Sequence, residues 1–154
     1  MDDLRVVVTA AGVVWGGAPV WDMPGAAWQE VFDVNVKAPL RVLQAFLPRL
    51  GKGSKVINFA SQLGASTWPY GGFDAYCAAK ASLGRLMRGM AMNLKDREII
   101  VGIVHPGWVQ TDMGGPTADL TPQESAKGVC TVAKDWMLER SGEFLQWNGE
   151  LHAW

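Results

Sequence analysis

Short apolar runs alternate along this chain with longer stretches of helical periodicity. Three runs are nearly apolar throughout, at residues 5–10, 55–60 and 99–105, and a weaker one lies at residues 143–147. Such runs are typical of strands that are buried on both faces of a parallel sheet. Their alternation with helices predicts an α/β fold of three layers, in which a parallel sheet lies between helices.

The helical periodicity predicts three long helices. The first covers about residues 26–50, the second about residues 73–95 and the third about residues 122–138. Thr121 is a suitable N-cap for the third helix, and Pro122 suits its first position. No repeat, linker or low-complexity tract interrupts this pattern, so residues 1–154 are expected to form one domain.

Composition narrows the class of protein. The chain has 154 residues, of which 49% are hydrophobic, and a formal net charge of −1. This size allows a substantial core, and the balanced charge indicates neither a nucleic-acid partner nor an anionic membrane. The acidic opening Met1-Asp2-Asp3 is unlike a signal peptide. Cys77 and Cys130 have no metal-ligand spacing, so we expect a cytoplasmic protein without a metal or a disulfide scaffold.

Candidate chemistry is concentrated near the start of the second predicted helix. Tyr76 and Lys80 are four residues apart, so their side chains should emerge on one helix face, one turn apart. A nearby ammonium lowers the pKa of a tyrosine from its usual value of roughly 10, which makes the phenol usable as a general acid or base. Taken alone, the pair also fits an ordinary helix with one aromatic residue and one solvated lysine.

Two more polar residues extend this pattern. Ser61 follows the second strand, and its hydroxyl could donate to a carbonyl oxygen that gains negative charge during reduction, although a simple turn residue is the alternative. Asn35 lies on the apolar face of the first helix, and Pro39 removes the N–H that its carbonyl would bind. A free carbonyl predicts a bound water, but a kinked helix with a satisfied asparagine fits equally.

The third strand runs into a sharp turn at Pro106-Gly107, whose exposed backbone can approach a flat ring closely. His105 is expected to be a packing residue at the end of this strand, and His152 a surface residue. Large apolar side chains in the loops suggest the wall of a substrate pocket: Trp68, Trp108 and Met113.

Taken together, these residues resemble the short-chain dehydrogenase/reductase family over essentially the whole chain. Four residues match the catalytic tetrad of that family in order and approximate spacing: Asn35, Ser61, Tyr76 and Lys80. Pro106-Gly107 stands where the family has its Pro-Gly motif. Residues 105–116 and 141–149 are most similar to the C-factor and sniffer-like carbonyl reductase branch.

The resemblance implies an oxidoreductase that uses NAD or NADP and transfers hydride between nicotinamide and a carbonyl or alcohol substrate. Tyr76 would pass the proton and Ser61 would steady the substrate oxygen. Lys80 would lower the tyrosine pKa and bind the nicotinamide ribose, while the carbonyl of Asn35 would hold a relay water. The cofactor contacts expected from the family are Lys80, Tyr76, Pro106, Gly107, Val109, Thr111 and Gly12.

Two features depart from the family. Its Asn-Asn-Ala-Gly motif is replaced by Thr9-Ala10-Ala11-Gly12, and its glycine-rich cofactor loop, with the first three strands, is absent from this sequence. Only strands 4-5-6-7 of the family would remain, and no loop would place a helix N-terminus at the pyrophosphate. Residues 5–10 then form an exposed apolar edge, which we expect a second copy of the chain to cover in a homodimer or homo-oligomer. The small-residue face of the Tyr76 helix is, by resemblance, another dimer surface.

Two functions are compatible with these features. The first is the oxidoreductase, which the intact tetrad favours. The second is a non-catalytic signalling or binding protein, because a shortened form in the C-factor group lacks the cofactor half and is associated with intercellular signalling. Hydrolysis by a Ser/His/Asp triad is disfavoured, since the sequence around Ser61 lacks Gly-x-Ser-x-Gly.

Overall fold

The computed structural model describes residues 4–16 and 19–154, so the acidic opening Met1-Asp2-Asp3 and Gly17-Ala18 lie outside the described residues. Four strands form one sheet: β1 (Leu4–Thr9), β2 (Leu50–Phe59), β3 (Ile100–His105) and β4 (Phe144–Gln146). All neighbouring pairs are parallel, and the order across the sheet is β1-β2-β3-β4. The predicted α/β fold with a parallel sheet is confirmed.

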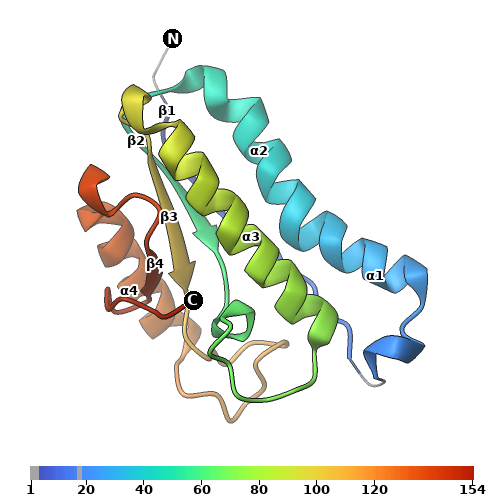
Figure 1. Ribbon diagram of the computed structural model, residues 1–154. Helices are drawn as coiled ribbons and strands as arrows, with labels where there is room; N and C mark the ends of the chain where they lie inside the picture. Colours follow the sequence, from blue (N-terminus) through green and yellow to red (C-terminus); the bar gives the residue numbers. More distant parts are fainter. Residues whose placement is uncertain (1–3, 17–18) are drawn as a thin grey trace.

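Helices cover both faces of this sheet. The α-helices are α1 (Gly25–Phe32), α2 (Ala38–Phe46), α3 (Asp74–Asn93) and α4 (Pro122–Asp135). Figure 1 shows α1, α2 and α3 on one side of the strands and α4 on the other. Short 3-10 turns complete the chain: η1 (Val20–Asp22), η3 (Leu47–Arg49), η4 (Gln62–Gly64), η5 (Lys95–Arg97) and η6 (Leu138–Arg140).

The first predicted helix is not continuous. A π-helical turn, η2 (Asp33–Lys37), separates α1 from α2, and α2 ends at Phe46 rather than near residue 50. Pro39 has no N–H to donate to the carbonyl four residues earlier, so the regular ladder is interrupted at this point. The interruption places Asn35 on a widened turn, where its side chain is fully buried.

Both faces of the sheet contribute to the core. On the side of α2 and α3, buried side chains from the strands and helices pack together: Val7, Leu43, Val56, Leu83, Met87 and Val101. On the side of α4, the core contains Ile57, Val104, Val129, Trp136 and Leu145. Apolar burial on this scale is the main stabilising contribution to the fold, at about 25 cal/mol per Å² of apolar surface.

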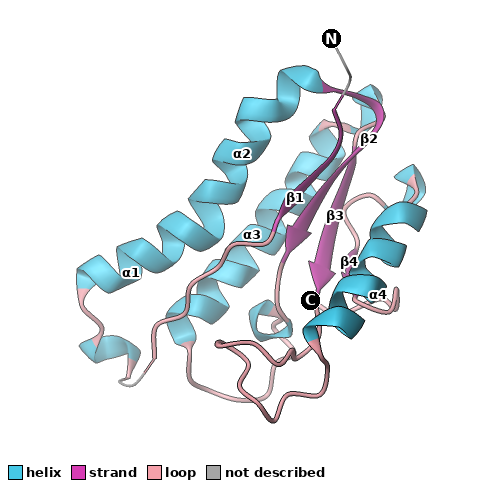
Figure 2. Ribbon diagram, turned by 180° about the vertical axis from the view of Figure 1, so that it is seen from behind, coloured by secondary structure: helices cyan, strands magenta, loops and turns pink. Residues whose placement is uncertain are grey.

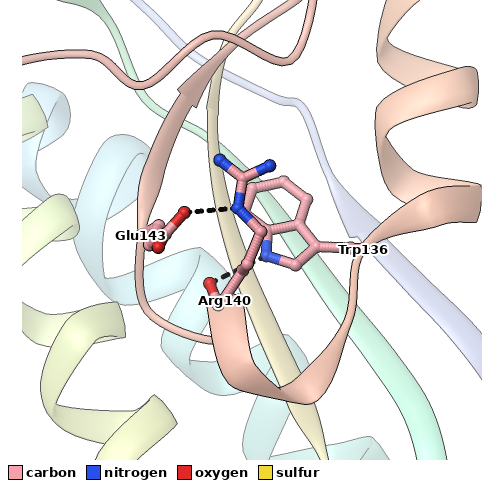
Figure 3. Close-up of polar contacts among 3 residues, drawn as sticks. All are labelled: Trp136, Arg140 and Glu143. Carbon is pink, nitrogen blue, oxygen red and sulfur yellow. Dashed lines mark hydrogen bonds and ion pairs between the residues drawn. The ribbon is translucent and has the colours of Figure 1, made fainter.

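Trp136 closes the core on the α4 side. Its ring packs so closely on β3 that a Cβ at Gly102 would lie 2.8 Å from ring atoms. Figure 3 shows its indole N–H donating to the carbonyl of Arg140 at 3.0 Å, while the guanidinium of Arg140 pairs with Glu143 at 2.7 Å. These contacts bring the end of α4 and the start of β4 against the sheet, so the large indole is buried with its polar atom satisfied.

Strand β1 is an edge strand with one uncovered face. Val7 points into the core, whereas Val6 and Val8 are 47% and 54% exposed. Figure 2 shows why, because α4 lies beside β3 and β4, away from β1. The expectation of an exposed apolar edge agrees with this exposure.

A segment near the end of the chain packs against α3. A Cβ at Gly84 would lie 2.7 Å from the ring of Trp154, and Ser66 donates its hydroxyl proton to the carbonyl of Trp154 at 2.8 Å. The indole also lies 5.4 Å from the ring of Phe144 and 5.7 Å from the guanidinium of Arg88. The small-residue face of α3 was expected to be open to a second chain. At Gly84 an indole of the same chain occupies the space, and the dimer surface on this face stays a prediction.

Candidate active site

Polar side chains gather at the carboxyl ends of the strands. The loops that follow β2 and β3 meet at one edge of the sheet, close to the start of α3 (Figure 1). Residues at this edge of an open parallel sheet can converge on one ligand although they are distant in sequence. Within the part of the chain that the structure describes, no group of three His, Cys, Asp or Glu side chains could hold a metal ion, and no helix is long and apolar enough to cross a bilayer.

Ser61 lies in a turn that is pressed against α3. It caps η4, and its Oγ accepts a hydrogen bond from the N–H of Leu63 at 3.2 Å. Gly64 follows in this turn, and a Cβ there would lie 2.7 Å from backbone atoms of Lys80 and Ala81. Only a glycine allows this approach, so Gly64 fixes how close the serine comes to the helix.

Tyr76 meets Ser61 from the first turns of α3. The Ser61 side chain lies beside the phenol, and this contact lowers the pKa of Tyr76. Burial raises the pKa by more, so the net shift is upward from the usual value of 10.0. The lowered pKa that we expected for Tyr76 is therefore not what this structure shows, because loss of solvent around the phenolate outweighs the contact with Ser61.

Lys80 is buried one turn further along α3, with 4% of its surface exposed. Its Nζ donates to the carbonyl of Phe59 at 2.8 Å and lies 5.5 Å from the ring centroid of Tyr76. Burial lowers the pKa of Lys80 to about 8. The ammonium is thus held beside the tyrosine by the end of β2, and it gives up its proton more readily than a surface lysine.

Asn35 reaches the same region from η2. Its Nδ2 donates to the carbonyls of Val13 and Val31 at 2.7 and 2.9 Å. Its Oδ1 has no hydrogen-bond partner. No other buried side-chain nitrogen or oxygen of the described residues lacks one. A Cβ built on Gly12 would lie 2.9 Å from this Oδ1 and 3.5 Å from the Nζ of Lys80. The missing side chain of Gly12 therefore leaves a small polar space between an acceptor and a donor.

The turn after β3 is shaped by its glycine. Gly107 has a φ of +85°, and a Cβ there would collide with Leu120 and lie 3.0 Å from Trp147. Ser125 on α4 donates to the carbonyl of Pro106 at 2.6 Å and holds the turn from the opposite side. The Pro-Gly backbone is thus rigidly placed at the carboxyl edge.

The predicted cofactor contacts Val109 and Thr111 lie further along this loop. Val109 forms an isolated parallel bridge with Leu120. The hydroxyl of Thr111 donates to the carbonyl of Val109 at 3.4 Å and accepts from the N–H of Gly114 at 3.2 Å. Thr111 is exposed, but its hydroxyl is turned into its own loop. A contact from this hydroxyl to a cofactor stays a prediction.

The three predicted pocket residues occupy two different loops. Trp68 lies between β2 and α3 and contacts Tyr70 edge-on at 5.2 Å. Trp108 and Met113 follow β3 and are 45% and 49% exposed, with the indole N–H of Trp108 donating to the carbonyl of Gly114 at 2.8 Å. Two surface cavities are lined by other residues, around Trp147 and around Phe73. The grouping of these three side chains as a substrate pocket stays a prediction.

His105 is a residue of this region that the sequence pattern undervalued. It is 6% exposed, and its Nδ1 accepts a hydrogen bond from the N–H of Gln62, next to Ser61, at 3.4 Å. Its ring centroid lies 5.6 Å from that of His152, which packs on Phe144 at 4.6 Å. His152 was expected on the surface; its ring is half-buried and packs in this group. The one available signal was a polar residue at the end of an otherwise apolar strand.

Comparisons with known proteins identify the family of this chain. Residues 1–121 match the family model described as short chain dehydrogenase. The chain is 35% identical over 152 residues to the C-signal of Myxococcus xanthus, covering 97% of this chain and 92% of that protein. It is 30% identical over 176 residues to an uncharacterized oxidoreductase of Schizosaccharomyces pombe, covering 97% of this chain and 70% of the other.

Solved structures show the same fold. The carbonyl reductase Sniffer of D. melanogaster has a TM-score of 0.94 at 26% identity, covering 99% of this chain and 67% of that one. The NADPH-bound carbonyl reductase from chicken fatty liver has a TM-score of 0.89 at 32% identity, covering 99% of this chain and 66% of that one. The chain thus spans about two thirds of these structures, and it belongs to the short-chain dehydrogenase family.

Proposed function

We propose that this chain carries the catalytic residues of an NAD- or NADP-dependent oxidoreductase that interconverts a carbonyl compound and its alcohol. The observation that carries the proposal is the convergence of the Tyr76 phenol, the Ser61 hydroxyl and the Lys80 ammonium at the carboxyl edge of the sheet. Ser61 lies in the turn after β2, and the other two groups come from α3. A proton donor beside a neutral hydroxyl suits a carbonyl oxygen that gains charge.

Each residue has a distinct role in this proposal. Tyr76 gives its phenolic proton to the substrate oxygen during reduction, and Ser61 donates a hydrogen bond to the same oxygen. Lys80 supplies positive charge beside the phenol. Its low pKa of about 8 also allows it to pass on a proton near neutral pH. The polar space that Gly12 leaves between Asn35 and Lys80 suits a relay water. This water would bind the side-chain Oδ1 of Asn35, which has no hydrogen-bond partner, and not the backbone carbonyl that the sequence suggested.

The residues present fit one end of a nicotinamide cofactor, which supplies or accepts the hydride when bound. Lys80 and Tyr76 would hold the nicotinamide ribose, and the glycine turn at Pro106-Gly107 offers backbone that a flat ring can approach. Val109, Thr111 and Gly12 complete the proposed contacts.

The proposal is tested by calorimetric titration with NADH and NADPH, followed by turnover measurements with an aromatic aldehyde or ketone. We expect binding and a turnover that Tyr76→Phe abolishes. Tyr70→Phe is the matched control, because Tyr70 is the other tyrosine of the chain and is 70% exposed. Absence of binding by either dinucleotide, with and without the carbonyl compound, would refute the catalytic proposal for this chain.

A second candidate function has an observation of its own. The chain is 35% identical over 97% of its length to the protein named C-signal. A non-catalytic signalling or binding role is therefore the alternative. It requires the fold and its surface but not the proton transfer. Tyr76→Phe would then leave the biological activity of the chain unchanged.

The uncovered edge of the sheet also bears on partners. We propose that a second copy of the chain pairs along β1, because Val6 and Val8 are half exposed beside an edge strand and two copies would cover each other. A parallel sheet leaves unpaired backbone groups on its outermost strand, which favours strand addition there. The small-molecule partner is the carbonyl compound or its alcohol.

A further inference from the structure

The turn that carries Ser61 is held from two sides. On one side, Gly64 allows it to touch the backbone of α3 at Lys80. On the other side, the N–H of Gln62 donates to the Nδ1 of His105 at 3.4 Å. Within the turn itself, the N–H of Leu63 donates to the Ser61 hydroxyl and the N–H of Gly64 donates to the Ser61 carbonyl. His105 is thus the side-chain link between the end of β3 and the turn after β2.

The environment of His105 suits an acceptor. An N–H can donate only to an unprotonated imidazole nitrogen. The Nδ1 of His105 must therefore be unprotonated, and in a neutral ring the proton must be on Nε2. His105 is 6% exposed, and burial, with a smaller contribution from His152, lowers its pKa to about 4. The ring is therefore neutral at physiological pH. His152 packs edge-on against it and itself rests on Phe144, so the imidazole plane is fixed by neighbours.

We propose that His105 is a positioning residue that fixes the Ser61 hydroxyl opposite Tyr76 by accepting the hydrogen bond of Gln62. His105 does not touch the reacting atoms. It acts through the turn, because Gln62 directly follows Ser61 and their peptide plane is set by this bond. The catalytic use of Ser61 rests on the proposed function, whereas the placement of its hydroxyl beside the phenol does not.

The tautomer is the first test and needs no variant. Long-range proton–nitrogen NMR correlation of the full chain at neutral pH should show Nδ1 of His105 unprotonated and Nε2 protonated. A proton on Nδ1 would overturn the proposal outright, because the Gln62 N–H would then have no acceptor there.

Amide exchange is the second test. His105→Leu should speed exchange of the Gln62 amide roughly fivefold, which corresponds to the loss of one hydrogen bond. The amide of Ala60, which donates to the carbonyl of Val104 at 2.8 Å, is the internal control for unfolding. His105→Asn offers an oxygen close to the position of Nδ1 and should restore protection. Unchanged exchange in His105→Leu, or failure of the asparagine to rescue, would contradict the proposal.

A third readout reports on Ser61 itself. The contact with Ser61 lowers the pKa of Tyr76, so displacing the turn should raise that pKa. In a Tyr70→Phe background, the pKa of Tyr76 measured by ultraviolet titration should therefore be higher in His105→Leu, as it should be in Ser61→Ala. It should return to its original value in His105→Asn. An unmoved titration in His105→Leu would exclude the positioning role. These measurements need no turnover, so a chain that fails to reduce carbonyls would refute the proposed function and leave them standing.

Discussion

The ammonium of Lys80 donates a hydrogen bond to the backbone carbonyl of Phe59 at 2.8 Å. This contact joins α3 to the last residue of β2, two positions before Ser61. The carbonyl at the end of a strand is a strong acceptor, and a charged donor makes the bond stronger than a neutral one. The lysine is therefore part of the structure that brings Ser61 and Tyr76 together, besides any charge it lends to the phenol.

Titration of Tyr76 tests the electrostatics of the site directly. In a Tyr70→Phe background the phenol should titrate above its usual value of 10.0, because burial raises the pKa of Tyr76. Ser61→Ala should raise it further, since the serine contact favours the phenolate. Ultraviolet difference spectroscopy measures both shifts. A downward shift on removing the serine hydroxyl would mean that the two side chains do not interact as described.

Lys80 should make the free energy of unfolding depend on pH. The pKa of Lys80 is about 8 in the folded chain against its usual value of 10.5, so between these values the unfolded chain binds more protons. The free energy of unfolding should therefore rise with pH from about 8 to about 10.5, by at most roughly 3 kcal/mol.

Urea denaturation of wild type and Lys80→Met over this range isolates that contribution, because other titrating groups are common to both proteins. The free energy of unfolding of the wild type, minus that of Lys80→Met, should increase as the pH rises. Lys95→Met, which removes an exposed lysine on η5, is the control and should follow the wild type. Parallel curves for wild type and Lys80→Met would show that Lys80 is not desolvated.

Gly12→Ala should disturb the space between Asn35 and Lys80. The added Cβ would lie 2.9 Å from the Oδ1 of Asn35, closer than real Cβ atoms approach, so buried groups must shift. We expect a loss of about 1–3 kcal/mol in unfolding free energy and weaker binding of any nicotinamide ligand. Gly51→Ala is the control, since nothing lies within 4 Å of its Cβ. Equal stability of the two variants would indicate that the space can expand.

Val8→Lys tests self-association along β1. Val8 is 54% exposed on the edge strand, and a lysine there places charge where a second copy would pack. If the chain pairs along this edge, sedimentation should shift from dimer to monomer in the variant. Met92→Lys, at a residue of α3 that is 70% exposed, should leave the distribution unchanged. A monomeric wild type, or a dimer that survives the change, would refute pairing along β1.

The sequence pattern located the strands because the runs are nearly apolar, although β2 begins at Leu50, before the predicted run at residues 55–60. Residues 55–60 and 99–105 overlap β2 and β3, which pair with each other in the middle of the sheet. Apolar runs of this kind are typical of strands that are buried on both faces. The spacing of Tyr76 and Lys80 was equally informative, because helical geometry places residues four apart on one face whatever the surroundings.

The remaining features depend on contacts that no local pattern encodes. The π-helical turn around Asn35 could be suspected from Pro39 but not its width, since the extra residue is accommodated by tertiary packing. The pKa of Tyr76 depends on how much solvent the fold removes, which spacing cannot report. The bond between His105 and Gln62 joins the ends of two strands, 43 residues apart in sequence, and is visible only in three dimensions.

Trp154 gives α3 an unusual neighbour. Its ring fills the notch above Gly84, one turn beyond Lys80, while its carbonyl holds the hydroxyl of Ser66 in the loop that leads to Tyr76. A partner that docks on this stretch of helix must lift the indole, and lifting it would also release the loop. Binding of a partner to this surface of α3 and ordering of the loop before Tyr76 are therefore linked through the side chain of Trp154.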